Sequence, residues 1–399
     1  MQSLPLAIWG SLGKGKRVTS EPGEAQQGRG QKVVLLGSYA PSLINFRGPL
    51  IAAMVARGHE VHAVAPDIDA DLAAEVRALG AEPVDVPLAR TSMDPLGARV
   101  TRRALTGLFR RIRPDVVIAY TIKPTVIGAA AARAAGVPRF IPLVTGLGYA
   151  FLGGLHPKRL LVRAAAIWMY RRAFRRSWFA IFQNEDDRRD FRRLGILARS
   201  LPTGLVAGSG VDTDHYAERP LPQGISFLMI SRFLRDKGVR EYGEAAMRLK
   251  REHPEVNVRL AGWLDESPDA VSQAEIDAMR AGGVECLGKL DDVRPALQAC
   301  SVYVLPSYRE GTPRSVLEAM ATGRAIVTTD APGCRETVVE GENGFLVPPK
   351  DSDALFEAMR RFVERPELAA EMGKASRRIA EDKFDVHRVN EALMRYAGL

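Results

Sequence analysis

The chain has 399 residues, of which 46% are hydrophobic and 26% are charged, and its formal net charge is +9. The length predicts two domains, each large enough to bury its own core, and the composition is that of an ordinary globular protein. Three cysteines without metal-ligand spacing and six scattered histidines offer no Cys/His metal cluster, and they predict thiols kept in a reducing compartment.

The charge is distributed unevenly between the two halves of the chain. Residues 1–210 contain 30 Lys and Arg against 15 Asp and Glu, whereas residues 211–399 contain 26 against 32. A basic first half would attract an anionic membrane surface or a phosphorylated acceptor. Nucleic acid is the competing partner, but the chain has no compact basic–aromatic nucleic-acid motif, so we expect none.

Residues 1–30 predict a disordered tail. They contain one short apolar patch, Leu4–Trp9, followed by a stretch rich in Gly, Lys and Gln, and they do not resemble a signal peptide. The longest uncharged stretch, Phe140–Leu155, is too short to span a bilayer and contains Pro142. We therefore expect a cytoplasmic protein without a spanning helix, attached peripherally to the inner face of the cell membrane.

Strands and helices alternate through residues 31–205, the expected N-terminal domain. A first helix is expected at about Gly48–Arg57. The predicted strands of this domain are Lys32–Gly37, Val61–Ala65, Asp115–Ala119, Arg139–Val144 and Phe179–Gln183. This βαβ rhythm predicts a parallel sheet covered on both faces.

The same rhythm restarts after a passage rich in Gly and Pro, residues 206–225, which we interpret as an interdomain linker. A second, C-terminal domain is expected at residues 226–385. Its predicted strands are Phe227–Ser231, Val258–Ala261, Val284–Leu287, Val302–Pro306, Ala325–Thr328 and Gly344–Val347. The predicted fold class is α/β, with two Rossmann-like parallel-sheet domains facing each other across a cleft.

One segment of the first domain predicts a basic amphipathic helix. Lys158–Arg176 has apolar residues at helical spacing, with Trp168, Tyr170 and Phe174 among many arginines. Such a helix can lie in the headgroup region of a membrane with its aromatic side inward. The alternative is an ordinary surface helix whose apolar stripe packs on the sheet.

Two glutamates eight residues apart, Glu310 and Glu318, mark the segment Ser301–Asp330. Glu310 lies in the loop at the carboxyl end of strand Val302–Pro306, and Glu318 lies in the second turn of a helix that we expect Thr312 to cap. Open α/β sheets bind ligands at this edge, and helix N-termini favour phosphate oxygens. Two carboxylates there suit a nucleotide-sugar, whose diphosphate lies between two sets of hydroxyls. Because surface glutamates at such junctions are common, the interpretation requires a matching phosphate site.

That phosphate site is predicted in the loop after Phe227–Ser231. Arg232 and Lys237 lie between this strand and a helix expected at Val239–His253. Two cations at the carboxyl end of a strand can neutralise a diphosphate and support a leaving nucleoside diphosphate. The alternative is a pair of solvated loop charges in an arginine-rich protein.

Several segments together resemble the family 4 retaining glycosyltransferases of the GT-B type. In the second half these are SRFLRDKGV, PSYREGTPRSVLEAMATGRAIV and ENGFLVPP, and the E-x7-E element is that family's main marker. In the first half, GSYAPSLINFRGPL, YTIKPTVIGAAAA, LVTGLGYAF and GSGVD resemble the bacterial branch that builds capsule, O-antigen and related lipid-linked glycans. The resemblance covers roughly residues 31–399. It implies that the last helix, residues 386–399, packs back on the N-terminal domain.

The resemblance implies a retaining transferase that moves a sugar from a UDP-linked hexose or N-acetylhexosamine to a polyprenyl-diphosphate-linked glycan, with the nucleotide-sugar as co-substrate and no other cofactor. Glu310 would contact the donor sugar, and Arg232 and Lys237 would hold the diphosphate. Glu318 would bind the ribose hydroxyls. The loop expected to assist with the phosphates consists of Gly311, Thr312, Pro313 and Arg314.

On the acceptor side, the resemblance brings the loop Ser38–Arg47 near the acceptor and the donor phosphates, with Asn45 and Arg47 as its polar contacts. Relatives often carry a histidine near the segment Tyr120–Lys123, and this chain has none there, so we assign no histidine base. Lys123 would contact the phosphate of the acceptor. The alternatives are stabilising loop contacts for the first two residues and a plain surface position for the lysine.

The motif D-x-D can indicate a metal-dependent enzyme, so we considered each match in the sequence. Four occur, beginning at Asp67, Asp69, Asp212 and Asp351. The first follows a predicted strand, where metal-dependent single-domain transferases hold a nucleotide diphosphate. Chance matches are expected among 47 acidic residues, and Arg232 and Lys237 already supply the countercharge. We therefore expect an enzyme that needs no metal.

Two other functions are compatible with the same fold. A UDP-sugar 2-epimerase or hydrolase would release free sugar from the donor without an acceptor, but its histidine and carboxylate set is not evident. A non-catalytic scaffold for glycan assembly would be marked by a broken E-x7-E element or a lost Arg/Lys pair. Both features are intact here.

Overall fold

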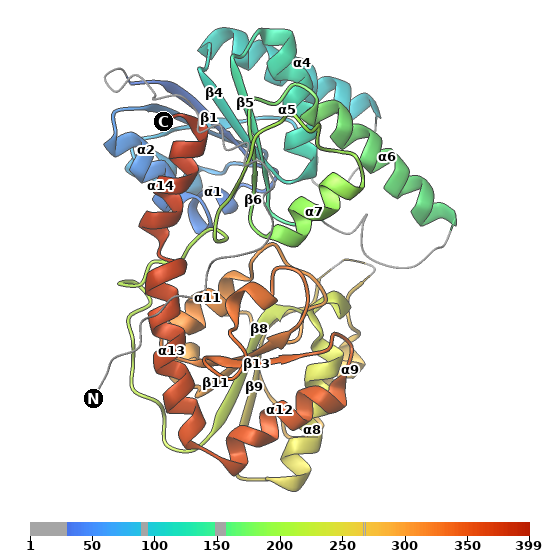
Figure 1. The fold of residues 1–399 in the computed structure, drawn as a ribbon, viewed down its shortest axis with the longest axis vertical. Coiled ribbons are helices and arrows are strands. Elements are labelled where there is room, and N and C mark those ends of the chain that lie inside the picture. Colours follow the sequence, from blue (N-terminus) through green and yellow to red (C-terminus); the bar gives the residue numbers. More distant parts are fainter. Residues whose placement is uncertain (1–29, 89–94, 148–156, 266, 268) are drawn as a thin grey trace, which may run out of the picture.

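The computed structural model of the protein describes residues 30–88, 95–147, 157–265, 267 and 269–399. This part forms two α/β domains stacked along the long axis of the molecule (Figure 1). The predicted tail of residues 1–30 lies outside the described residues except for its last glycine.

The first domain contains a sheet of seven parallel strands in the order β3-β2-β1-β4-β5-β6-β7. Its strands are β1 (Lys32–Leu36), β2 (Glu60–Ala65), β3 (Glu82–Asp85), β4 (Val116–Tyr120), β5 (Arg139–Val144), β6 (Ala180–Phe182) and β7 (Thr203–Leu205). In β1, Val33 and Leu35 pack into the core on one face of the sheet, and Val34 and Leu36 pack into the core on the other. This two-sided burial explains the continuous apolar runs that predicted the central strands.

Helices cover both faces of this sheet (Figure 1). They are α1 (Ser42–Asn45), α2 (Gly48–Ala56), α3 (Ala70–Ala78), α4 (Pro95–Ile112), α5 (Ile122–Ala135), α6 (Pro157–Phe174) and α7 (Glu185–Arg193). In the described part of the chain, no helix is long and apolar enough to cross a membrane.

The second domain repeats the arrangement with six parallel strands in the order β10-β9-β8-β11-β12-β13. Its strands are β8 (Ser226–Arg232), β9 (Asn257–Trp263), β10 (Glu285–Gly288), β11 (Val302–Leu305), β12 (Ala325–Thr329) and β13 (Gly344–Val347). Its helices are α8 (Val239–Glu252), α9 (Gln273–Ala281), α10 (Arg294–Gln298), α11 (Arg314–Ala321), α12 (Ser352–Glu364) and α13 (Glu367–Lys383).

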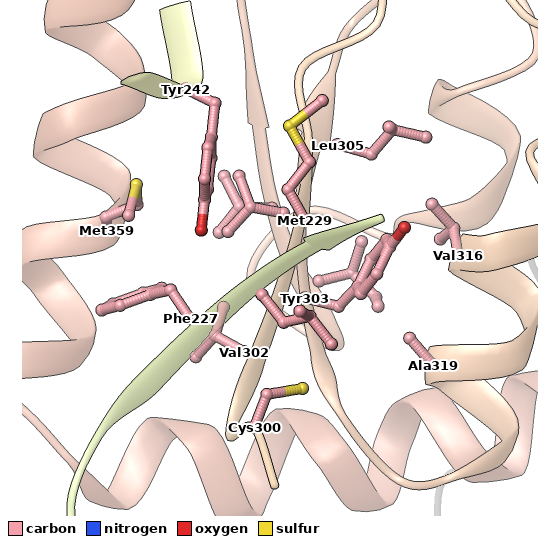
Figure 2. Packing of buried hydrophobic residues seen from close by; sticks show 14 of the residues in the cluster. Phe227, Met229, Tyr242, Cys300, Val302, Tyr303, Leu305, Val316, Ala319 and Met359 are labelled. Carbon is pink, nitrogen blue, oxygen red and sulfur yellow. The ribbon is translucent and has the colours of Figure 1, made fainter. Parts of the chain in front are cut away.

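The core of the second domain lies on both sides of β8 and β11. Figure 2 shows Tyr242 of α8 and Met359 of α12 on one side of these strands, and Val316 and Ala319 of α11 on the other. The hydroxyl of Tyr242 donates to the carbonyl of Arg259 at 2.7 Å, so the buried phenol keeps a hydrogen-bond partner. The predicted fold class, two Rossmann-like parallel-sheet domains, is confirmed.

The chain passes between the domains twice, and the two crossings lie side by side. The N–H of Val211 donates to the carbonyl of Phe384 at 2.8 Å, and the N–H of Val386 donates to the carbonyl of Val211 at 3.0 Å. The last helix, α14 (Val386–Ala397), then buries residues such as Leu393 in the core of the first domain. The two crossings are thereby tied into one connection between the domains.

The sequence did not predict three short elements. Strand β3 contains a proline and two acidic residues, and β7 has only three residues, so neither shows the apolar run of a buried strand. Helix α1 lies inside the predicted loop Ser38–Arg47, which was therefore too simple a prediction. Four residues are too few for a helical period to be visible in the sequence.

The packing of α14 on the first domain generates a stability prediction. Leu393→Ala removes a buried side chain and leaves a cavity, so it should lower stability by about 2–5 kcal/mol and lower the thermal unfolding midpoint. Glu391→Ala on the same helix is the control, because its carboxylate is exposed and makes only a 3.9 Å ion pair with Arg57. Equal midpoints for the two variants would show that α14 contributes no core packing.

Candidate active site

Two loops that lie far apart in the sequence meet at the carboxyl edge of the second sheet. Strands β8 and β11 are neighbours, so the loops that follow them start side by side. Lys237, in the 3₁₀ turn Arg235–Lys237, places its Nζ 2.5 Å from Oε1 of Glu310. The hydroxyl of Ser307 donates to the same oxygen at 2.9 Å. The structure therefore brings Lys237 and Glu310 into one cluster.

The charges in this cluster hold one another in place. Burial is the largest single cause and lowers the pKa of Lys237, but the charges of Glu310 and Asp236 and the hydrogen bond to Glu310 together outweigh it, so the pKa lies above its ordinary value and the amine stays protonated. Arg232 also has a carboxylate partner, because its Nη1 lies 2.8 Å from Oδ2 of Asp265. Burial raises the pKa of the adjacent Asp236. Both predicted cations are thus already paired, and an anionic ligand would join or replace these carboxylates.

Glu318 is buried in α11 and is held by two donors. Its Oε1 accepts from the hydroxyl of Tyr216 at 3.0 Å and from Nε of Arg314 at 2.8 Å. Burial raises the pKa of Glu318, and the charge of Arg314 opposes this shift. Sequence reasoning missed Tyr216, because it lies 102 residues away in the predicted linker and no local pattern marks it.

The helix that carries Glu318 does not begin as predicted. Pro313 occupies the N-cap position of α11, and no side chain caps the helix. The expected cap by Thr312 is wrong, because its hydroxyl donates to the carbonyls of Gln183 at 3.3 Å and Gly311 at 2.9 Å instead. Pro313 has no N–H to offer a phosphate. Within the described residues, the N–H groups of Gly311 and Thr312 donate no hydrogen bond, so they can bind a ligand.

The same loop is pressed against the first domain. A Cβ atom added at Gly311 would lie 2.3 Å from the carbonyl oxygen of Thr145, in the loop that follows β5. Only glycine allows so close an approach of two backbones. The amide of Asn184, just after β6, donates to the carbonyl of Gly311 at 2.7 Å. The carboxyl edges of the two sheets therefore face each other at this loop.

Arg309, the residue before Glu310, forms ion pairs that hold this interdomain contact in place. Arg309 lies 2.5 Å from Asp187 and 2.7 Å from Asp190, both on α7, and the Asp187 side chain is fully buried. Burial raises the pKa of Asp187, although the Arg309 charge opposes this shift. We call these contacts of Asn184, Asp187 and Asp190 with Arg309 and Gly311 the interdomain clamp.

The start of α7 explains why these residues face the second domain. Asn184 is the N-cap, and its Oδ1 accepts from the N–H of Asp187 at 2.7 Å, while its Nδ2 donates both to Oδ2 of Asp187 and to the carbonyl of Gly311 in the other domain. Three acidic residues follow in the first turn, where the helix dipole favours them. The second of these three residues, Asp186, pairs at 2.5 Å with Arg335 of the second domain. In the sequence, an Asn followed by three acidic residues is a recognisable signal for the start of a helix. Nothing in the sequence indicated that these residues contact the second domain.

Arg47 lies at the N-terminus of α2 and is almost completely buried, with 4% of its surface exposed. Its guanidinium lies over the ring of Tyr120, 5.1 Å from the centroid. Burial lowers its pKa to about 10, and the charge of Arg314 from the other domain contributes to the lowering. Its buried Nε has no partner among the described residues. Two like charges, one of them incompletely hydrogen-bonded, favour an anion between the domains.

The other two predicted acceptor contacts lie at the carboxyl edge of the first sheet. Asn45 is exposed at the end of α1, and Lys123 lies in the first turn of α5, after β4. Burial lowers the pKa of Lys123. What these two residues bind stays a prediction.

Three aspartates of the D-x-D matches have local structural roles. Asp69 caps α3 by accepting from the N–H of Leu72, and Asp351 caps α12. Asp212 accepts from two N–H groups in its own turn. Over the described part of the chain, no three His, Cys, Asp or Glu side chains form a group that could hold a metal ion. The expected metal independence stays a prediction.

Comparison with known proteins gives two family matches that follow the domain order. Residues 47–201 match the family "Glycosyl transferase 4-like domain", and residues 214–379 match "Glycosyl transferases group 1". A curated relative from Campylobacter jejuni, named N,N'-diacetylbacillosaminyl-diphospho-undecaprenol alpha-1,3-N-acetylgalactosaminyltransferase, is 29% identical over 355 residues, which are 86% of this chain and 92% of the relative.

Solved structures share the whole architecture. Sucrose-phosphate synthase from Thermosynechococcus elongatus has a TM-score of 0.74 at 17% identity, over 91% of this chain and 97% of that one. The Anabaena protein HepE in complex with UDP has a TM-score of 0.71 at 20% identity, over 91% and 98%. At these identities the two structures establish the fold. The two family matches, together with the Campylobacter relative, show that this chain belongs to the family 4, group 1 glycosyltransferases of glycan biosynthesis, and the solved structures show that it has their GT-B fold.

Proposed function

We propose that the protein is a retaining transferase that moves a hexose or N-acetylhexosamine from a UDP-sugar to a polyprenyl-diphosphate-linked glycan at the inner face of the cell membrane. The observation that carries the proposal is the contact of Lys237 with Glu310, which unites the two predicted ligand loops beside the first domain. The name of the Campylobacter relative includes a diphospho-undecaprenol acceptor, and HepE was solved with UDP. Both names support these classes of acceptor and donor.

The donor diphosphate would lie between the two domains, at the start of α11. The N–H groups of Gly311 and Thr312, which donate no hydrogen bond within the described residues, would serve as donors there, and the buried Arg47 would approach from the first domain. Lys237, which stays protonated, and Arg232 would supply further positive charge from the loop after β8 in the second domain. The diphosphate would thus separate the like charges of Arg47 and Arg314.

Glu310 would contact the hydroxyls of the donor sugar and orient its anomeric carbon. Its Oε1 is fixed by Lys237 and Ser307, so the carboxylate has one defined direction. No residue of the cluster is a convincing covalent nucleophile, which favours attack on the same face as the leaving group. The acceptor oxygen bonds to the anomeric carbon, the bond to the diphosphate breaks, and the leaving diphosphate takes the proton of the acceptor hydroxyl.

The interdomain clamp would position this chemistry. Arg309 and Gly311 flank Glu310 on both sides, and both are held by α7 of the first domain. The acceptor-side domain therefore controls where the donor-side carboxylate lies. An error of about 1 Å in such a group is enough to reduce a rate by about 100-fold.

The proposed function is tested by screening nucleotide-sugars for UDP release with and without a polyprenyl-diphosphate-linked acceptor. Acceptor-dependent release with formation of the longer glycan is the expected result. Release of free sugar without an acceptor would instead identify a 2-epimerase or hydrolase. UDP-sugar binding with no turnover under any condition would identify a scaffold.

Glu310→Gln should lower kcat by about 100-fold or more while the affinity for UDP changes little. The amide keeps the size of the side chain but loses the charge that Lys237 neutralises and the acceptor geometry for sugar hydroxyls. Steady-state kinetics and calorimetry with UDP measure the two quantities. Glu364→Gln, on the exposed side of α12, is the matched control. Unchanged turnover in Glu310→Gln would refute the role of this carboxylate.

Arg309→Gln should lower kcat by about 10- to 100-fold with a smaller change in KM for the donor. The variant leaves the buried Asp187 carboxylate without its cation, which displaces the loop that carries Glu310. Adding Asp187→Asn replaces the ion pair by a neutral amide pair and should restore much of kcat. Thermal unfolding of each variant separates this effect from a loss of folded protein. A double variant no better than the single one would argue against positioning by this pair.

Activity should be insensitive to chelation. Excess EDTA is expected to leave the rate of acceptor-dependent UDP release unchanged, because protein cations and N–H groups supply the countercharge to the diphosphate. Added Mg²⁺ or Mn²⁺ should not raise the rate. A rate abolished by EDTA and restored by either ion would overturn this part of the proposal.

A further inference from the structure

The outer surface of the first domain exposes apolar side chains in one region. Of the eleven large hydrophobic residues that are exposed in the described part of the chain, six lie on α4 and α6. The most exposed residues of α6 are Leu161, at 73%, and Trp168, at 62%. Single exposed apolar residues are normal on a soluble protein, but a concentration on two helices that line the same groove marks a contact surface.

Among the residues of α6 whose burial is described, 160–174, the buried ones lie in the second half of the helix. Ala166, Tyr170 and Phe174 are buried in the core, as an ordinary surface helix requires. Residues 160–165, with the sequence LLVRAA, are exposed at every position. Figure 1 shows this end of α6 extending away from the sheet. Of the two predictions for the segment Lys158–Arg176, packing therefore holds for the second half of the helix, whereas residues 160–165 are left exposed.

A groove of about 490 Å³ lies between α4, α5 and α6. Apolar residues such as Ile127, Val137 and Phe140 form part of its lining, and Trp168 stands at its side. Its charged lining consists only of arginines, namely Arg99, Arg102, Arg133, Arg172 and Arg176. Within the described residues none of these five forms an ion pair with an acidic side chain. The groove thus combines an apolar interior with unneutralised positive charge.

The charge of this region selects the kind of partner. Residues 95–184, which include α4, α5 and α6, contain 16 Lys and Arg and a single acidic residue, Asp115. A second copy of the chain docking through the same face would bring arginines against arginines, which opposes a symmetric dimer. The surface of a bilayer has phosphate groups next to a layer of hydrocarbon chains. It therefore complements a protein surface that has arginines next to apolar side chains.

We propose that this face, α4, α6 and the groove between them and α5, docks on the anionic phospholipid surface of a bilayer. Leu161 and Trp168 enter the headgroup region, and the arginines of the groove bind lipid phosphates. The inference rests on the proposed function in one respect: it explains how a membrane-borne acceptor is reached. The groove begins at Val126, one helical turn beyond Lys123, so the docked bilayer lies next to the predicted acceptor side of the site.

The test is co-sedimentation of the full chain with vesicles of phosphatidylcholine alone and of phosphatidylcholine mixed with phosphatidylglycerol. The protein should bind the mixed vesicles, bind the neutral ones weakly, and dissociate as salt is added. Arg102→Ala with Arg172→Ala should weaken binding to mixed vesicles by roughly 30-fold, from the loss of two charges near the surface. Leu161→Asp should weaken it by roughly 10-fold or more.

Matched controls come from exposed positions of the second domain. Arg365→Ala with Arg378→Ala removes two exposed arginines, and Val339→Asp places a charge at an exposed apolar position. Neither should change vesicle binding. Because all substituted side chains are exposed, the variants should keep the thermal unfolding midpoint of the unchanged protein, which is measured alongside.

The outcomes separate this inference from the proposed function. Vesicle binding needs no donor or acceptor, so it can succeed even if no transfer is found, and transfer to an acceptor in detergent can succeed without vesicles. The α4–α6 variants should keep their transfer rate in detergent. Equal binding to neutral and anionic vesicles, or equal binding by the α4–α6 variants and the controls, would overturn the proposal. So would a stable dimer in solution that Leu161→Asp dissociates, because this face would then be a contact between copies.

Discussion

The contact between α7 and the loop around Glu310 is the constraint on which the site depends. Asp187 is fully buried and pairs with Arg309, and Asn184 holds the carbonyl of Gly311. A buried carboxylate is costly without its cation, so the two domains have one favourable approach at this point. The loop that carries Glu310 is consequently positioned by residues of the opposite domain as well as by its own.

This constraint explains two other features of the interface. Glycine is required at position 311 because the backbone of Thr145 lies where a Cβ atom would be. Arg47 and Arg314 are brought close together from opposite domains, and burial lowers the pKa of Arg47 to about 10. The contact of the two domains therefore places positive potential between them, which would suit the diphosphate of a nucleotide-sugar.

The first domain presents two basic surfaces with different neighbours. At the carboxyl edge of its sheet, Arg47 faces the second domain, whereas the arginines around the α4–α6 groove face outward. Helix α5 connects these two regions. Lys123, in its first turn, lies at the sheet edge, and later residues of the helix line the groove. A donor brought by the second domain and a lipid-borne acceptor brought by a membrane would meet along this helix. The excess of positive charge in the first half of the chain thus has a definite location in the structure.

The sequence by itself determined the two-domain parallel-sheet fold and the family, because buried strands, turns and the E-x7-E element are local patterns that survive without knowledge of their neighbours. It also brought Lys237 and Glu310 to one sheet edge. It was wrong about the cap of α11 and missed β3, β7 and Tyr216, whose roles depend on partners far away in the chain. Only the tertiary structure decided that Arg309 meets Asp187 and that residues 160–165 of α6 stay exposed, because long-range pairing and burial are properties of the packed chain and leave no local period.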